Sequence, residues 1–364
     1  MGRMGEDAGQ ESSWSFRLVE WLRRRVLAVM KPYAPSHVAI IMDGNRRWAR
    51  QRCLAAYAGH PRGSRKLTEA AEWCAAAGVE TLTVYAFSVD NFRRSPDEVE
   101  ALMRLARDKF AEWLHERRQR GDGVMVGAAG GQRAVRVRVI GQLPLLPPTV
   151  RRLAEEINAA DAQSEWATAK TPALRLNVCV AYDAVADVEQ AVRRVRAGLH
   201  AGLLQPSDVD AELISALMGN ADPAIGELSA RARSAQVSLL IRTSAEPRLS
   251  SFLLWQTCAV PTSESDGSSD ETCVALVRAL WPDFGWWDFV LVLVWYAWRT
   301  LWRTRKSGEK RPPAREAQRV ERFLCWCDAN DAMARKTYVS GTEANGDGGC
   351  NERGGNTFVE GYSV

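Results

Sequence analysis

Charged side chains of both signs gather at one point where an apolar run ends. The run Val38–Met42 is followed at once by Asp43, Gly44, Asn45, Arg46 and Arg47, which begin a helical pattern. A glycine at a strand-to-helix turn lets the backbone approach a ligand, and the free N–H groups of a helix start suit an anion. The arginines could clamp a diphosphate on which the aspartate holds Mg²⁺. An Asp-Gly turn with solvated arginines is the alternative interpretation.

Polar clusters also follow two other apolar runs. The first cluster consists of Arg242, Ser244, Arg248 and Ser250, and the second of Ser88, Asn91 and Arg94. Open parallel sheets bind ligands at the carboxyl ends of their strands, so we expect the three clusters to converge. His60 follows Gly59 and is one of four histidines; taken alone, such a histidine is more often structural than a ligand.

The elements that must position these clusters are short β-branched runs separated by long helical stretches. The predicted strands are Val38–Met42, Thr81–Phe87, Val135–Ile140, Leu174–Ala181 and Val237–Arg242. They predict an α/β fold with a mostly parallel central sheet flanked by helices. A helix start is marked by Ser95 as cap, Pro96 in the first turn and Glu98 as the partner in a capping box. The glycine-rich stretch Gly121–Gly131 is expected to be a loop.

Composition excludes several classes of protein. The chain has 364 residues, of which 46% are hydrophobic and 25% charged, and its net charge of +4 is too balanced to indicate nucleic-acid binding. Eight scattered cysteines without metal-ligand spacing argue against zinc and against a disulfide framework. We divide the chain into an amphipathic extension (1–36), a globular domain (37–304) with an exposed insertion at about 258–272, and a basic, disordered tail (305–364).

Two apolar stretches are not expected to span a membrane. Trp14–Met30 carries charges at Arg17, Glu20 and Arg23–Arg25, so it predicts an amphipathic helix on a membrane, on a partner or on its own domain. The residues of its apolar face are Trp14, Leu18, Leu22, Val26 and Val29. Phe289–Trp298 has ten uncharged residues, whereas a membrane-spanning helix needs roughly 20. It predicts a buried or membrane-surface helix.

Several motifs in one order resemble the cis-prenyltransferases. They are HVAIIMDGNRRWA from His37, Gly59-His60, YAFSVDNFRRS from Tyr85, LLIRTS from Leu239, RLSSFLLWQ from Arg248 and WPDF from Trp281. Together they cover nearly all of residues 37–300. The Arg46-Arg47 pair, Asn91–Ser95, Leu176–Cys179 and the serine Ser244 are more similar to the eukaryotic dehydrodolichyl diphosphate synthases than to the bacterial undecaprenyl diphosphate synthases.

The resemblance implies that farnesyl diphosphate is extended by isopentenyl diphosphate units with cis double bonds, giving a long-chain polyprenyl (dehydrodolichyl) diphosphate for dolichol synthesis and protein glycosylation. It implies that Asp43 holds Mg²⁺ and that Ser88 and Asn91 line the reacting region. The implied primer site is Gly44, Asn45, Arg46, Arg47, His60 and Arg94, and the implied isopentenyl diphosphate site is Arg242, Arg248 and Ser250. An apolar product tunnel is expected along Leu102, Met103, Leu105 and Phe110, although a core face is the alternative for those residues.

The chain also departs from the family pattern. Ala245 replaces a usual glycine, so a positive φ there would be strained. Cys273, eight residues before Trp281, stands where homodimeric members have a metal-binding glutamate, and the chain does not end in Arg-x-Gly. The resemblance therefore implies the catalytic subunit of a heteromer with a Nogo-B-receptor-like partner, in peripheral contact with the cytosolic face of the endoplasmic reticulum membrane.

Two rival hypotheses remain open at this point. A non-catalytic scaffold subunit would keep the fold without the chemistry, but it would have no use for the arginines and for Asp43. A binding module for another diphosphate, such as a nucleotide sugar, is disfavoured because neither G-x-G-x-x-G nor a P-loop is present.

Overall fold

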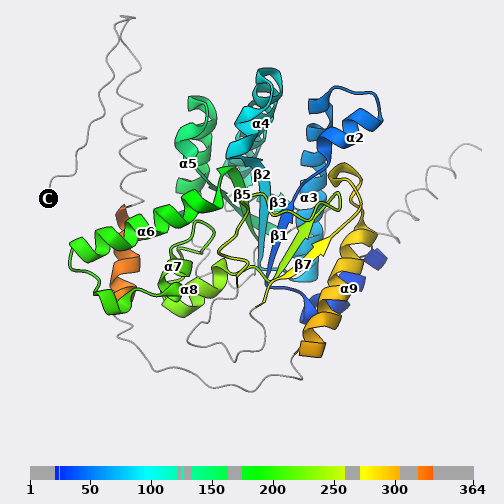
Figure 1. The fold of residues 1–364 in the computed structure, drawn as a ribbon. Coiled ribbons are helices and arrows are strands. Elements are labelled where there is room, and N and C mark those ends of the chain that lie inside the picture. Colours follow the sequence, from blue (N-terminus) through cyan, green and yellow to red (C-terminus); the bar gives the residue numbers. More distant parts are fainter. Residues whose placement is uncertain are drawn as a thin grey trace, which may run out of the picture.

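A twisted sheet with helices packed on it forms the centre of the computed structural model, which describes residues 21–23, 25–120, 124–126, 133–162, 174–258, 271–303 and 319–330. Within these residues the strand order is β3-β4-β5-β2-β1-β6-β7 (Figure 1). The strands are β1 (His37–Ile41), β2 (Thr81–Ser88), β3 (Val124–Val126), β4 (Arg133–Ile140), β5 (Leu174–Tyr182), β6 (Leu239–Arg242) and β7 (Cys273–Leu276). Only the pairing of β3 with β4 is antiparallel, so the predicted mostly parallel sheet is confirmed.

The five predicted strands are present with ends shifted by one or two residues, but β3 and β7 were missed. The loop prediction for Gly121–Gly131 was wrong at Val124–Val126, which pairs with the start of β4. Three residues between glycines are too short to show a periodic pattern. The edge strand β7 alternates buried and exposed residues over only four positions, directly after the insertion.

Helices and short 3₁₀ turns connect the strands. The α-helices are α2 (Asn45–Gln51), α3 (Gly59–Ala77), α4 (Pro96–Arg120), α5 (Pro148–Ala162), α6 (Ala184–His200), α7 (Ala211–Ala216), α8 (Leu228–Ala235) and α9 (Trp286–Arg303). The 3₁₀ turns are η1 (Lys31–Tyr33), η2 (Ala56–Ala58), η3 (Val89–Arg93), η4 (Leu143–Leu145), η6 (Pro206–Asp208) and η7 (Trp281–Asp283). The helix predicted after Ser95 is α4, and it begins at Pro96 as expected.

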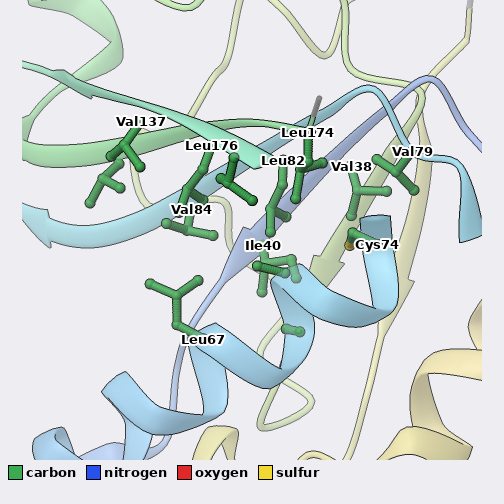
Figure 2. Close-up of a cluster of buried hydrophobic side chains, with 14 of the residues drawn as sticks. Val38, Ile40, Leu67, Cys74, Val79, Leu82, Val84, Val137, Leu174 and Leu176 are labelled. Carbon is green, nitrogen blue, oxygen red and sulfur yellow. The ribbon is translucent and has the colours of Figure 1, made fainter. Parts of the chain in front are cut away.

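The main core lies between the sheet and α3. Leu67 and Cys74 of α3 face alternate residues of the central strands, among them Val38, Ile40 and Leu82 (Figure 2). The intervening residues Ala39 and Ile41 belong to a second cluster with Phe252 and Leu253 on the other side of β1. Every residue of β1 and β6 is buried, as expected for central strands covered on both faces.

A third cluster joins α6, α7 and α8 to a helix near the end of the described chain. Residues 319–330 are helical, and Val320, Phe323 and Leu324 are fully buried in this cluster. Arg231 of α8 donates to both carboxylate oxygens of Asp328 at 2.7 and 2.8 Å. The prediction of a disordered tail over 305–364 was therefore wrong for residues 319–330, because a mixed composition hid an amphipathic helix. The rest of that tail lies outside the described residues.

The N-terminal stretch is helical over its described residues, 21–23 and 25–30. Leu27 is buried in the main core, whereas Leu22, Val26 and Val29 of the predicted apolar face are exposed. The helix thus packs on its own domain through a residue outside that face. The second apolar stretch lies in α9, and no described helix combines the length and hydropathy needed to cross a bilayer. Most of the predicted insertion lies outside the described residues.

Candidate active site

The carboxyl ends of β1, β2 and β6 meet at a cavity of about 390 Å³. Its polar wall contains most of the predicted site residues, namely Asp43, Asn45, His60, Ser88, Asn91, Arg94, Arg242, Arg248 and Ser250. Three clusters far apart in sequence are therefore brought together because their strands are neighbours in the sheet. Gly44, Arg46 and Arg47 are not among the lining residues, but Gly44 directly follows Asp43, Arg47 contacts Asp43 at 3.4 Å and Arg46 lies 3.6 Å from Glu98.

Two arginines hold the carboxylate of Asp43, two residues beyond the end of β1. Its Oδ2 accepts hydrogen bonds from Arg242 Nη2 at 3.0 Å and from Arg47 Nη2 at 3.4 Å. Its backbone carbonyl accepts from Thr243 Oγ1 at 2.6 Å and from the backbone N–H of Trp281 at 2.9 Å. Because both contacts of the carboxylate use Oδ2, the second oxygen is available to a metal ion.

The turn into α2 depends on glycine. Gly44 has a φ of 108°, and a Cβ there would lie 2.4 Å from Ser244 Oγ, so a side chain would be excluded. At the start of α3, a Cβ on Gly59 would lie 2.2 Å from the carbonyl oxygen of Asn45, and one on Gly63 2.4 Å from Asn45 Oδ1. These close approaches place Asn45 against α3 at the edge of the cavity.

Glu98 is a site residue that sequence reasoning missed. Its Oε1 accepts a hydrogen bond from Arg94 Nη1 at 2.9 Å, one helical turn earlier. The same oxygen lies 3.6 Å from Arg46 Nε and 3.7 Å from His60 Nε2, although the glutamate is only 4% exposed. The i,i+4 spacing to Arg94 was the available signal. The buried carboxylate fixes the arginines of the predicted primer site.

His60 contributes hydrogen bonding rather than charge. Burial, assisted by the positive charge of Arg94, lowers the pKa of His60 to about 4, so the ring is neutral at pH 7. Its Nε2 is buried without a hydrogen-bond partner, since 3.7 Å to Glu98 is too long for one. An unpaired ring nitrogen in the cavity wall can donate to a phosphate oxygen.

The buried guanidinium of Arg242 organises the loop after β6. It is 5% exposed, and its Nη1 donates to Ser250 Oγ at 3.0 Å and to the backbone carbonyl of Arg248. Arg248 itself is exposed and pairs with Glu246 at 2.9 Å, which places it at the cavity mouth. Through its bond to Asp43, Arg242 links the two predicted diphosphate sites.

That loop is held in an unusual backbone conformation. The predicted positive φ at Ala245 is present, at 53°, and four more non-glycine residues share the left-handed region: Ser244, Ser250, Ser251 and Leu253. Each costs roughly 1–2 kcal/mol. Such strain persists only where other contacts fix the chain, and here the N–H groups of Ser244 and Ala245 donate to the carbonyls of Ala279 and Val277.

Ser88 and Asn91 form a turn between β2 and α4. The backbone N–H of Ser88 donates to Asn91 Oδ1 at 3.2 Å, and the Ser88 hydroxyl accepts from the backbone N–H of Asn91. Both residues line the cavity, as predicted for the reacting region. Their mutual hydrogen bonds indicate that they also fix the shape of this wall.

Cys273 lies away from this site. It is buried in β7 beside Leu239, at the amino end of β6, whereas Leu276 pairs with Arg242 at the carboxyl end. Three residues of strand correspond to about 10 Å. A side chain at position 273 therefore cannot ligate a metal held by Asp43 of the same chain.

The other half of the cavity is mainly apolar, with Lys109 of α4 as a charged lining residue. It is lined by Leu67 of α3, by Leu102, Met103, Leu105, Ala106, Phe110 and Trp113 of α4, and by Val178 and Val180 of β5. All four residues proposed for a tunnel wall are in this list. The cavity thus combines a cationic end with a hydrocarbon-like end, which suits an amphiphile with an anionic head.

The charge balance of the polar end favours an anion. Five arginines (Arg46, Arg47, Arg94, Arg242 and Arg248) meet three carboxylates (Asp43, Glu98 and Glu246). Within the described parts of the chain, no three His, Cys, Asp or Glu side chains form a metal cluster. Asp43 alone fits Mg²⁺ that takes its other ligands from phosphates and water.

Comparisons with known proteins agree with this chemistry. Residues 41–303 match the Prenyltransf family, described as undecaprenyl diphosphate synthase. The chain is 36% identical over 254 residues to the human dehydrodolichyl diphosphate synthase complex subunit, an alignment that covers 70% of this chain and 64% of the human protein. The mouse subunit is 33% identical over 314 residues, covering 86% of this chain and 80% of that protein.

An archaeal relative and a solved structure extend the comparison. The tritrans,polycis-undecaprenyl-diphosphate synthase (geranylgeranyl-diphosphate specific) of Thermococcus kodakarensis is 40% identical over 225 residues, 61% of this chain and 73% of its own. The structure of lavandulyl diphosphate synthase from Lavandula x intermedia, in complex with dimethylallyl diphosphate, superposes with a TM-score of 0.57 at 26% identity, covering 73% of this chain and 96% of that one.

Proposed function

The chain belongs to the undecaprenyl diphosphate synthase family, the cis-prenyltransferases, and from this premise we propose that it extends farnesyl diphosphate with isopentenyl diphosphate into a long-chain dehydrodolichyl diphosphate. The observation that carries the proposal is a cavity lined at one end by Arg94, Arg242 and Arg248, with Arg46 and Arg47 beside it, and at the other end mainly by apolar side chains. Prenyl transfer needs both ends, because a diphosphate leaves while a hydrocarbon chain grows.

The polar residues of the cavity form two anion-binding sites, one for each diphosphate. Arg94 and Arg46, fixed by Glu98, and the unpaired Nε2 of His60 hold the primer diphosphate. As the C–O bond of the primer breaks, negative charge grows on that diphosphate, and preplaced cations stabilise it.

The second site holds the isopentenyl diphosphate at the loop after β6. Arg242 fixes Ser250 Oγ at 3.0 Å and the backbone at Arg248, so the bound unit is held near the first carbon of the primer. Mg²⁺ on Asp43 would supply further charge neutralisation for the diphosphates when bound.

The scaffold alternative is disfavoured by the same contacts. The guanidinium of Arg242 and the carboxylate of Glu98 are nearly buried, and burying ions adds little stability to a fold. A non-catalytic subunit would therefore have no use for these two buried charges.

We also propose a heteromer at the cytosolic face of the endoplasmic reticulum membrane. Two relatives are named as subunits of a complex, and the described residues contain no group of three His, Cys, Asp or Glu side chains that could hold a metal ion. A partner of the Nogo-B-receptor type would supply further donors. The membrane location is supported by the product, because a long polyprenyl chain partitions out of water.

The test is incubation of the purified chain with labelled isopentenyl diphosphate, Mg²⁺ and an allylic primer, with and without the candidate partner. We expect weak transfer by the chain alone, a large increase with the partner, and use of farnesyl in preference to geranylgeranyl diphosphate. Preference for geranylgeranyl diphosphate would instead mean that the chain has the primer specificity for which the archaeal relatives are named. If no labelled isopentenyl diphosphate is incorporated with either primer, even in the presence of the partner, the proposed transferase function is wrong and the scaffold function is favoured.

Product length should depend on Trp113. The main cavity and a second cavity of about 80 Å³ share Leu67, Lys109 and Trp113 as a common wall. Removing the indole in Trp113→Ala should join the two spaces and shift products toward longer chains by at least one five-carbon unit. Chain lengths are read by chromatography, with Trp113→Phe as the control that keeps an aromatic ring at this position. An unchanged distribution in both Trp113→Ala and Leu67→Ala would place the end of the growing chain elsewhere.

A further inference from the structure

α9 carries a continuous stripe of exposed apolar side chains. The residues of this stripe are Trp287, Leu291, Val294, Trp298, Leu301 and Trp302, and each is between 47% and 70% exposed. Their spacing of three and four residues follows one helix face, while Phe289, Leu293 and Ala297 on the other face are buried in the core. An exposed surface of this kind marks an interaction site.

The N-terminal helix lies beside α9 and adds to this surface. The guanidinium of Arg23 sits 5.8 Å from the ring centroid of Trp286, and Figure 1 shows the helix against α9. Trp21, Leu22, Val26 and Val29 of this helix are exposed. Two segments at opposite ends of the domain sequence therefore both present large apolar side chains to solvent.

Most charges along these two segments are positive, and Asp288, beside Trp287 in the first turn, is the one acidic residue of α9. Residues 21–30 and 289–302 contain no Asp or Glu, and their only charged residues are arginines. Arg25 stacks over Trp21 at 5.2 Å and Arg299 over Trp295 at 5.6 Å. Tryptophan beside arginine is typical of helices that lie in the interface of a bilayer, with the indole at headgroup depth and the cation toward anionic lipid.

We propose that the outer face of α9, together with the N-terminal helix, docks the protein onto an anionic phospholipid bilayer. Neither helix needs to cross the bilayer, because both keep one face packed on the domain. α9 begins five residues after Trp281, which lines the reaction cavity, so docking here keeps that cavity close to the lipid surface. The proposal assigns a surface for membrane contact and is independent of the transfer chemistry.

The proposal is tested by flotation of the full-length protein with vesicles of phosphatidylcholine alone and of phosphatidylcholine mixed with phosphatidylserine. We expect binding that is stronger with phosphatidylserine and falls as salt is raised. In the double variant Trp298→Ser/Trp302→Ser the partition coefficient should fall by about a hundredfold, roughly tenfold for each indole removed from the interface. The control Leu145→Ser changes another exposed apolar residue, which lies on η4, and this variant should bind as the wild type does.

Two further measurements separate membrane docking from its alternatives. Light scattering without vesicles reports the oligomeric state; if the wild type self-associates and Trp298→Ser/Trp302→Ser does not, the α9 face is a contact between copies and the proposal fails. Flotation of Val26→Ser/Val29→Ser tests the N-terminal helix. If only that variant loses binding, α9 is not part of the membrane contact. Circular dichroism of each variant verifies folding, and none of these readouts requires prenyl transfer to occur.

Discussion

Asp43→Asn should lower kcat/KM for prenyl transfer by about a thousandfold or more, because it removes the carboxylate that we propose holds Mg²⁺ on the diphosphates. Asparagine is the right replacement because its amide oxygen can still accept the hydrogen bond from Arg242 Nη2, now at 3.0 Å. Alanine would leave a 5% exposed guanidinium without its partner, which destabilises a fold by several kcal/mol. Loss of activity in Asp43→Asn would then report chemistry rather than folding.

The measurement is the initial rate with labelled isopentenyl diphosphate over a titration of Mg²⁺, together with a thermal melt. Asp90→Asn is the matched control, since Asp90 lies in η3 near the same cavity, is 74% exposed, and contacts only Arg93 at 3.3 Å. Its rate and Mg²⁺ dependence should equal those of the wild type. If Asp43→Asn kept a wild-type response to Mg²⁺, the metal would be held elsewhere and Asp43 would only position Arg242.

The convergence of the three clusters could be predicted from sequence for a physical reason. Parallel strands have their carboxyl ends at one edge of a sheet, so polar residues directly after Ile41, Phe87 and Ile241 had to meet if those strands were neighbours. The structure places β1 between β2 and β6. The pattern identified the strands correctly because each is an apolar run long enough to be buried.

Features that depend on tertiary partners could not be predicted in the same way. Glu98 has the spacing of a capping residue, and only the fold brings Arg46 and His60 to its carboxylate. Cys273 was aligned with a metal ligand by counting from Trp281, yet β7 carries it into the core about 10 Å below the site. The helix at 319–330 is stable because α6 and α8 cover it, which a local pattern does not show.

The structure indicates that the predicted isopentenyl diphosphate residues differ in how much activity depends on each of them. Arg248 is exposed and already paired with Glu246, so its loss should affect mainly substrate capture at the cavity mouth. Arg242 is buried and connects Asp43, Ser250 and the backbone of Arg248. One side chain thus sets the distance between the metal-binding carboxylate and the second diphosphate site.

Arg242→Gln should therefore lower kcat/KM by two to three orders of magnitude, since truncating one partner of a buried charge pair costs about 2–5 kcal/mol. The partner left behind, Asp43, is 31% exposed and can be hydrated, so the fold should survive. Ser250→Ala removes only one of the contacts made by Arg242. We expect it to raise the KM for isopentenyl diphosphate and to leave the KM for the primer unchanged.

Arg242→Lys distinguishes the geometry of the guanidinium from its charge. The two Nη groups of Arg242 serve partners on different sides, with Nη2 on Asp43 and Nη1 on Ser250, and a single ammonium cannot span both. Arg242→Lys should thus lose nearly as much activity as Arg242→Gln, whereas Arg93→Gln, at a side chain 87% exposed near the same cavity, should lose none. Steady-state kinetics with each substrate varied in turn provides the comparison. Near-wild-type activity in Arg242→Lys would mean that a point charge suffices and that the two diphosphate sites are not coupled through this residue.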